Sequence, residues 1–349
     1  MAARACRAGS AAAAGCALSH LEGKRTMPAT FRFGLACLET RRNNYDVTNR
    51  VETTDPASVS REVSRMFVEL YPDASTQPLE RSFADVARLY RGEYPGYRAC
   101  DTGYHNLQHT LDVTLAMARL MDGYERTRDR AEAIGSRRFA FGIVAALLHD
   151  IGYLRRINDT RHENGAEYTL KHVSRGAKFI EHYMEQIGMP ELALVAGQIV
   201  HFTGYERTVD RIMVPNLMFR MLGNMLGTAD IIAQMADRCY LEKCRDRLFP
   251  EFVAGGLAAK DEGDRRRSVL FRDVQDLLLH TPQFYKTATL RLKQQLGGAY
   301  GYAQRHFGGQ NLYIEEIDKN IHYAEEVAEQ RDLSLLRRTP PSPRSDDDS

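Results

Sequence analysis

The sequence lacks the features that would place this protein outside the cell or in a membrane. Its six cysteines form no CxxC pair, and Cys239 and Cys244, five residues apart, have a poor spacing for shared zinc ligation. We therefore expect free thiols in a reducing compartment and a cytoplasmic protein. The longest apolar runs are near ten residues, too short to span a bilayer, so we expect no membrane association.

An excess of charge of either sign is also missing. The 349 residues include 47 Lys and Arg against 46 Asp and Glu, which leaves a net charge of +1. Composition therefore gives no support for a nucleic-acid or membrane-surface partner, and we expect a small-molecule ligand. The sequence leaves the oligomeric state open.

The two ends of the chain have the composition of segments outside a packed core. Residues 1–27 are Ala-rich, and no acidic residue precedes Glu22. We interpret them as a disordered leader upstream of a second possible start at Met27, with a targeting segment as the alternative. Residues 28–57 are expected to be a poorly defined linker, and residues 336–349, rich in Pro, Ser and Asp, a disordered tail.

Between Gly96 and Met189 there is no proline, and the alternation typical of strands is missing. Apolar residues recur at spacings of three and four instead, which predicts an all-α fold. We expect one helical domain over residues 58–335, with its core at 104–230. The expected helices cover residues 58–70, 83–90, 111–121, 139–148, 166–187, 192–200, 218–247, 269–280, 284–296 and 314–332.

The sequence YHNLQHTLDV at residues 104–113 holds two histidines four residues apart. On a helix or helical turn this spacing places His105 and His109 on one face, with their Cβ atoms about 5 to 6 Å apart. One of them could then bind a metal while the other carries a proton.

A second polar pair ends the apolar run 139–148. His149 and Asp150 follow it directly, and Asp230 falls on the apolar stripe of a later helix. Burying such groups without a partner costs several kcal/mol, and a divalent cation is the simplest partner. Packed helices would bring His109, His149, Asp150 and Asp230 together as a nitrogen and oxygen cage.

Seven of the eleven histidines lie within residues 105–201. His172 and His201 lie beside or at the end of apolar helices and could hold a second metal. For His162 and His182, both in polar surroundings, we expect ordinary hydrogen-bonded or surface histidines.

The order His, then His-Asp, then a distant Asp resembles the HD superfamily of metal-dependent phosphohydrolases. YHNLQHTLDV is similar to the YHNxxHxxDV signature of the class I cyclic-nucleotide phosphodiesterases. The resemblance implies a multi-helix HD/PDEase-type domain with helical N- and C-terminal extensions. It implies His105 as the general acid and Asp150 as a bridge between two metals. The first metal would be bound by His109, His149, Asp150 and Asp230.

The sequence also departs from that family. Class I phosphodiesterases place a histidine three residues after the HD aspartate, where this chain has Tyr153. The segment HVSRGA that starts at His172 looks like the HPxxGA segment of the HD-GYP phosphodiesterases, and His201 falls where those enzymes place a further ligand. The chain thus resembles a combination of the two, and neither supplies its substrate.

Phosphoester hydrolysis needs a nucleophile, charge neutralisation and a proton for the leaving oxygen. A metal pair (Fe, Mn, Zn, Co or Mg) would supply the first two through an activated bridging hydroxide, with Asp150 at the bridge, and His105 the third. Asn106 could orient His105, and Asp112 could fix the tautomer of His109 or be an ordinary surface residue.

The leading hypothesis is therefore a metal-dependent phosphodiesterase that acts on a cyclic or diesterified nucleotide. One alternative is a nucleoside monophosphate phosphatase. Another is a regulatory nucleotide-binding module that has lost turnover, although the presence of His105 argues against it.

Overall fold

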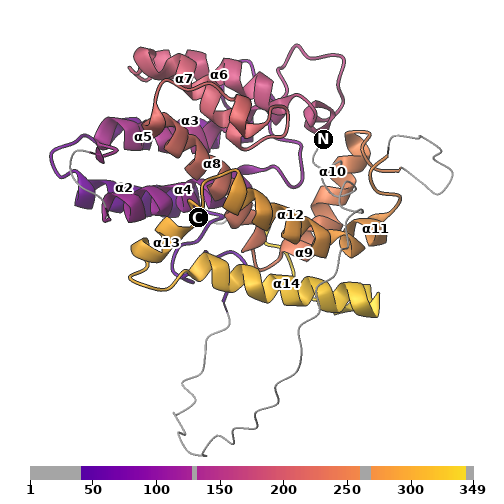
Figure 1. The fold of residues 1–349 in the computed structure, drawn as a ribbon. Coiled ribbons are helices and arrows are strands. Elements are labelled where there is room, and N and C mark those ends of the chain that lie inside the picture. The colour runs from indigo at the N-terminus through magenta and orange to yellow at the C-terminus, as the bar shows by residue number, and fades with distance from the viewer. Residues whose placement is uncertain (1–40, 128–131, 260–268, 343–349) are drawn as a thin grey trace, which may run out of the picture.

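The computed structural model describes residues 41–127, 132–259 and 269–342. Within these ranges the regular structure is helical, and extended backbone occurs only as isolated bridges, which confirms the expected all-α fold. The predicted leader and residues 343–349 of the predicted tail lie outside the described residues. The prediction of a disordered tail is wrong for residues 336–342, because Leu336 is buried and the backbone N–H of Arg338 donates to Glu242 at 3.2 Å. Figure 1 shows α6 and α7 on one side of the molecule and α14 on the opposite side, with α4 and α8 between them.

The helix bounds follow the labels of Figure 1. The α-helices are α2 (Pro56–Leu70), α3 (Gln77–Arg91), α4 (Leu107–Glu125), α5 (Ser136–Leu148), α6 (His172–Gln186), α7 (Ala193–Ile199), α8 (Leu217–Met235), α9 (Tyr240–Lys243), α10 (Phe249–Ala254), α11 (Val274–Leu279), α12 (Thr281–Gln294), α13 (Gly301–His306) and α14 (Leu312–Gln330). Short 3₁₀ turns include η2 (Ile151–Tyr153), η3 (Gly165–Tyr168) and η5 (Val200–Phe202), and η7 (Cys244–Leu248) is a π-helical turn.

Helix α4 lies at the centre of the fold. It packs against α8, α13, α5 and α2, and nearly all of its side chains are buried. Asn106 starts the helix, because its side-chain oxygen accepts the free backbone N–H of His109 at 3.2 Å. Helix α5, whose residues 139–148 are all buried, packs beside it. Helix α4 thus begins beside His105 and His109, and helix α5 ends directly before His149.

Two buried charges on α4 attach the outer segments of the chain. Arg119 forms an ion pair with Asp46 and donates a hydrogen bond to the Tyr313 hydroxyl on α14 at 3.1 Å. Asp122 pairs with His306 on α13 at 2.6 Å. The predicted linker 28–57 is therefore ordered in its described part: residues 41–55 form a folded loop that Asp46 closes by accepting the N–H of Val51.

Several predicted helices have different bounds in the structure. The predicted helix 166–187 is divided, because η3 ends at Tyr168 and α6 begins only at His172, with Leu170 exposed between them. The predicted helix 218–247 is also divided, since α8 ends at Met235 and α9 and η7 follow as separate short elements. No apolar periodicity indicates the short helix α13, which was not predicted.

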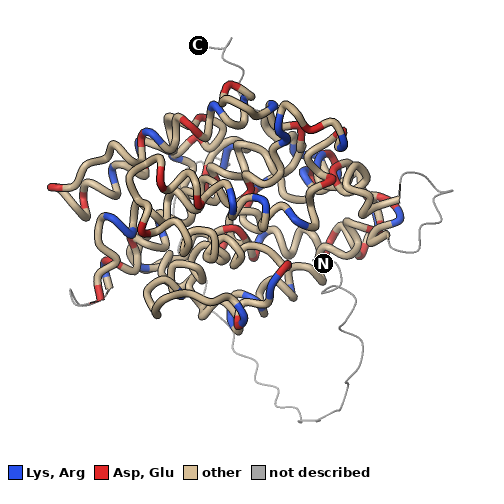
Figure 2. Tube along the Cα trace, turned by 90° about the horizontal axis from the view of Figure 1, so that it is seen from above, with Lys and Arg blue, Asp and Glu red and all other residues tan. Residues whose placement is uncertain are grey.

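The surface mixes charges of both signs. In Figure 2, basic and acidic residues are interspersed over the described trace. None of the described helices has the combination of length and apolar character needed to cross a membrane.

Candidate metal centre

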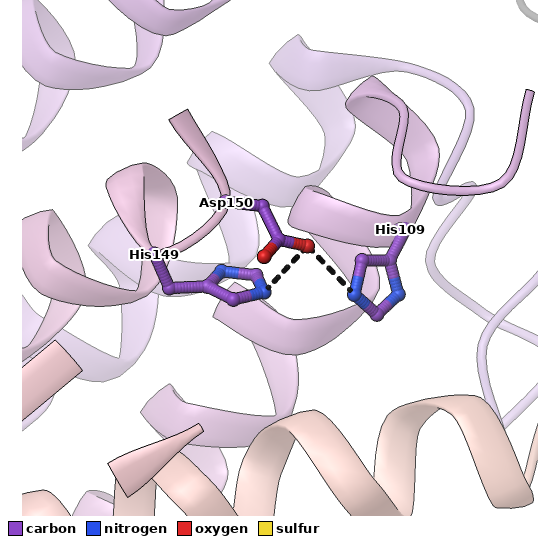
Figure 3. A group of neighbouring side chains, drawn as sticks. All are labelled: His109, His149 and Asp150. Carbon is purple, nitrogen blue, oxygen red and sulfur yellow. Dashed lines mark ion pairs between the residues drawn. The ribbon is translucent and has the colours of Figure 1, made fainter. Parts of the chain in front are cut away.

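His109 and His149 approach the same carboxylate oxygen from two different helices. His109 lies in the first turn of α4, and His149 follows the last residue of α5. Figure 3 shows both rings directed at Asp150. The Nε2 atoms of His109 and His149 lie 3.4 and 3.2 Å from Asp150 Oδ2. All three residues are buried, and they form the group of described residues that could hold a metal ion.

The hydrogen bond on the other side of the His149 ring defines its tautomer. His149 Nδ1 donates to the carbonyl oxygen of Ala146 at 2.7 Å, because that oxygen can only accept. In the neutral ring, Nε2 would direct a lone pair at Asp150 Oδ2, and neither atom has a hydrogen-bond partner among the described residues. Burial alone would lower the pKa of His149, but Asp150 outweighs burial and raises it. Two buried lone pairs repel each other unless a proton or a cation lies between them.

The spacing of the nitrogen and oxygen atoms fits a shared cation. Two ligand atoms that each lie about 2.1 Å from a metal, at angles between 90° and 109°, are about 3.0 to 3.4 Å apart. The two contacts to Asp150 Oδ2 fall within or at the edge of that range. Asp230 on α8 extends the cluster, with its Oδ1 atom 3.4 Å from His109 Nε2 and 3.9 Å from His149 Nε2.

Without a cation, charge in the cluster shifts the pKa values strongly. Burial alone would lower the pKa of His109, but Asp150 and Asp230 outweigh burial and raise it to about 10. Burial alone would raise the pKa of Asp150, but His149 and His109 hold it well below its usual range. The carboxylates thus favour positive charge at this position, which a bound cation could supply in place of protons.

His172 faces the second oxygen of Asp150. Its Nε2 atom lies 3.5 Å from Asp150 Oδ1, while its Nδ1 atom donates to the carbonyl oxygen of Thr169 at 2.7 Å. Burial lowers the pKa of His172, which keeps the ring neutral and its Nε2 lone pair available. The two oxygens of Asp150 therefore face different histidines, an arrangement that suits a carboxylate between two cations.

His201 is less closely joined to the cluster. It lies buried on η5, and its Nδ1 atom has no hydrogen-bond partner in the described part of the chain. Burial and then Arg207 lower its pKa to about 4, so the ring is neutral. No ion pair links it to a carboxylate of the described residues, and its assignment as a ligand stays a prediction.

His105 lies beside the cluster but outside α4. The helix begins at Leu107, so the two histidines do not share a helical face as the spacing predicts. Their ring centroids are nevertheless 5.7 Å apart. His105 Nδ1 pairs with Oε1 of Glu251 on α10, and Oε2 of the same carboxylate accepts the backbone N–H of Tyr104 at 2.9 Å and that of His105 at 3.3 Å.

Tyr153 occupies the place where the class I pattern has a histidine. Its buried ring lies between two imidazoles: the centroid distances are 4.5 Å to His105 and 4.3 Å to His172, with the rings nearly parallel. Tyr153 therefore fills the space between the predicted proton donor and a predicted ligand, and it holds both rings by stacking.

The predicted supporting residues have other partners. Besides starting α4, Asn106 donates to the carbonyl oxygen of Gly103 at 2.8 Å, so it positions His109 and not His105. Asp112 lies beside Thr53 and Lys243, and burial raises its pKa to about 6. No hydrogen bond joins Asp112 to His109 among the described residues.

The two histidines expected to be ordinary are away from the cluster. His162 pairs with Asp159 at 3.0 Å, and the side chain of His182 is 70% exposed.

A cavity of about 210 Å³ opens beside the cluster, and we call it the chamber. At its polar end lie His105, His109, Asp150, His172 and Asp230. Its far wall is apolar and includes Ile231, Leu248, Phe252, Phe271, Leu277 and Phe284. No lysine or arginine is among the described residues that line it. The chamber therefore combines apolar surface with a carboxylate-containing cluster, which could accept an anionic group only once a cation has bound.

Sequence reasoning missed two carboxylates of this site. Glu251 is buried, and its neighbours in the sequence include Phe249, Phe252 and Val253. A carboxylate on an apolar helix is the signal that identified Asp230, and it could have identified Glu251 as well. Glu206 accepts the N–H of Val173 at 3.0 Å and so caps the start of α6, beside His172. Its position in an irregular segment carries no periodic signal.

No family model, curated protein or solved structure matches this chain. What the protein does is therefore argued from the site itself.

Proposed function

We propose that this protein is a metal-dependent phosphodiesterase, with His109, His149, Asp150 and Asp230 holding one divalent cation. The observation that carries the proposal is the buried contact of 3.2 Å between His149 Nε2 and Asp150 Oδ2, which needs a proton or a cation between the two atoms, next to a histidine held by a carboxylate. His172 on the other side of Asp150 is the best-placed ligand for a second cation. Bound cations would supply charge neutralisation and an activated water.

His105 has the position and the support of a general acid. Glu251 engages its Nδ1 atom, which leaves Nε2 as the nitrogen that exchanges a proton with a ligand in the chamber. Burial alone would lower the pKa of His105, but Glu251 outweighs burial and raises it. A raised pKa favours the protonated ring, the form that can give a proton to the leaving oxygen.

The charges in the chamber favour a diester over a monoester. A phosphate monoester carries up to two negative charges, and the chamber offers no lysine or arginine among its described residues to balance them. It carries instead the carboxylates of Asp150, Asp230 and Glu206. A diester has a single negative charge, and an apolar wall suits a base or another ring as its ester group. A cyclic or diesterified nucleotide is therefore the substrate class we propose.

The first experiment is metal analysis of the purified protein followed by a substrate screen. The enzyme is stripped with a chelator, reloaded separately with Fe, Mn, Zn, Co or Mg, and assayed on cyclic mononucleotides, 2′,3′-cyclic phosphates, cyclic dinucleotides and nucleoside monophosphates. We expect hydrolysis of at least one diester and a clear preference over the monophosphates. A preference for monophosphates would instead support the phosphatase, and metal binding with no turnover would support a binding module.

A further inference from the structure

A second hollow lies on the other side of the turn that carries Asp150. We call it the rear groove; it has a volume of about 470 Å³ and runs between the loop at residues 94–97 and α6. Its floor includes Ile151, Gly152 and Leu154. Asp150 and Tyr153 of the same turn line the chamber instead. The turn at residues 150–154 therefore separates two cavities.

The rear groove is lined by basic side chains and by no described carboxylate. Arg156, Arg175, Lys178 and His182 line it. The guanidinium of Arg175 is fixed, because it donates to the carbonyl oxygens of Gly152 and Leu154. Arg156 and Lys178 are exposed and form no ion pair with a described carboxylate, so they remain available to a ligand. His182 has an acidic neighbour, Glu185, at 3.7 Å, and Asp159 lies close enough to Arg175 to affect its pKa.

Three aromatic rings complete the lining. Tyr97 and Phe179 meet edge to face with centroids 5.5 Å apart, and Tyr94 lies 6.3 Å from Tyr97 and 6.4 Å from Phe179. The guanidinium of Arg156 lies over the Tyr97 ring at 5.0 Å. Rings and cations therefore occur side by side, the combination that binds a flat aromatic group joined to an anion.

We propose that the rear groove binds a small anion that carries an aromatic ring, of the nucleoside monophosphate class, independently of the metal centre. Lys178 and Arg156 contact the phosphate, and Tyr94, Tyr97 and Phe179 contact the ring. The volume lies in the range of small-molecule sites, about 300 to 1,000 Å³.

The test measures binding directly and needs no activity. AMP, adenosine and inorganic phosphate are titrated by calorimetry into the wild type and into Asp150→Asn, whose metal centre is disabled. We expect AMP to bind both proteins equally, and more tightly than adenosine or phosphate. The double variant Arg156→Glu/Lys178→Glu should weaken AMP binding by about tenfold or more, while Lys286→Glu on exposed α12 surface should leave it unchanged.

A second variant separates the two parts of the ligand. Phe179→Ala should weaken the binding of AMP and leave the weak binding of phosphate unchanged. Arg156→Gln/Lys178→Gln, which avoids new acidic groups, should give the same direction as the charge reversal, and circular dichroism confirms folding of each variant.

Three results would overturn the proposal. The first is no AMP binding at millimolar concentration, and the second is AMP binding that charge reversal leaves intact. The third is loss of AMP binding in Asp150→Asn, which would place the nucleotide at the metal centre. Binding of an RNA oligonucleotide without binding of AMP would count as the first result. If AMP binds as expected but no diester is hydrolysed, the proposed function fails and the rear groove stands.

Discussion

The chamber and the rear groove share one turn of backbone but have opposite electrostatics. The chamber contains three carboxylates and no lysine or arginine among its described residues, whereas the groove contains four basic side chains and no described carboxylate. The chamber can accept an anion only after a cation has bound. The groove carries positive charge on its own side chains. Part of that charge is held in place, because the guanidinium of Arg175 donates to the carbonyl oxygen of Gly152.

The comparison shows that net charge does not describe the charge at either cavity. A balance of 47 basic against 46 acidic residues predicts no preference for anions. The fold nevertheless separates the two signs at its cavities, on the two sides of residues 150–154. Screening limits each field to about 8 to 10 Å at physiological ionic strength, so local composition decides what binds.

Asp150→Asn should have the largest effect, and it should act on the chamber alone. The amide removes the negative charge that faces three histidines, so the purified variant should lose most of its metal and at least about 10³-fold of its activity. Metal analysis and a diester assay check this. AMP binding to the rear groove should remain, and full metal content in the variant would contradict the ligand assignment.

His105→Ala should lower kcat by about 10²- to 10⁴-fold without loss of metal, because a general acid lies outside the metal cluster. The loss should shrink for a nitrophenyl phosphodiester, whose leaving group departs without a proton. Glu251→Gln should have the same signature with a smaller loss, since it positions His105. Loss of metal equal to that of His109→Ala would refute the role of His105.

Gly152→Ala should damage both cavities at once. A Cβ atom at this position would lie 1.7 Å from the backbone oxygen of His172, so the turn and α6 have to separate. We expect a loss of about 3 kcal/mol in unfolding free energy, together with weaker metal and AMP binding. Gly301→Ala adds the same methyl group where nothing lies within 4 Å and should change none of these. Denaturant unfolding and calorimetry distinguish the two variants.

Asp46→Asn should have the smallest effect, and neither cavity should change. Burial alone would raise the pKa of Asp46, but Arg119 and several hydrogen bonds hold it at about 2, below the ordinary value of 3.8. The carboxylate therefore stabilises the fold above pH 3.8, and this stability is lost as the pH falls towards 2. The stability difference between wild type and variant should narrow by about 2 kcal/mol from pH 5 to pH 2. A constant difference would show that Asp46 does not titrate as expected.

Local patterns in the sequence predicted most of the helices and the grouping of His109, His149 and Asp150. Apolar residues at spacings of three and four located α2, and a continuous apolar run located α5, because these helices bury one face or all faces against their neighbours. The expected helix 314–332 corresponds to α14. The same reasoning placed His149 and Asp150 at the inner end of α5, and their burial follows from that position.

Features that depend on distant contacts were not predictable in this way. The break before α6 depends on Glu206, which caps the helix from another segment. The orientation of the His105 ring depends on Glu251, which is 146 residues away in the sequence. Helix α13 carries almost no apolar periodicity, and it packs on α4 through a glycine, since a Cβ at Gly123 would meet the Tyr302 carbonyl oxygen at 1.9 Å. Contacts between residues so far apart in the sequence leave no trace in the local spacing of apolar residues.

The contact between His105 and Glu251 also determines when the site can be completed during synthesis of the chain. Closing a loop of 146 residues costs roughly 4 kcal/mol plus a constant in chain entropy, and the helices between must dock first. While the protein emerges from the ribosome, His105 and the first ligands appear more than a hundred residues before α10. A nascent chain that stops short of residue 251 can bury His149 and Asp150. Its His105 still lacks the Glu251 carboxylate that orients the ring.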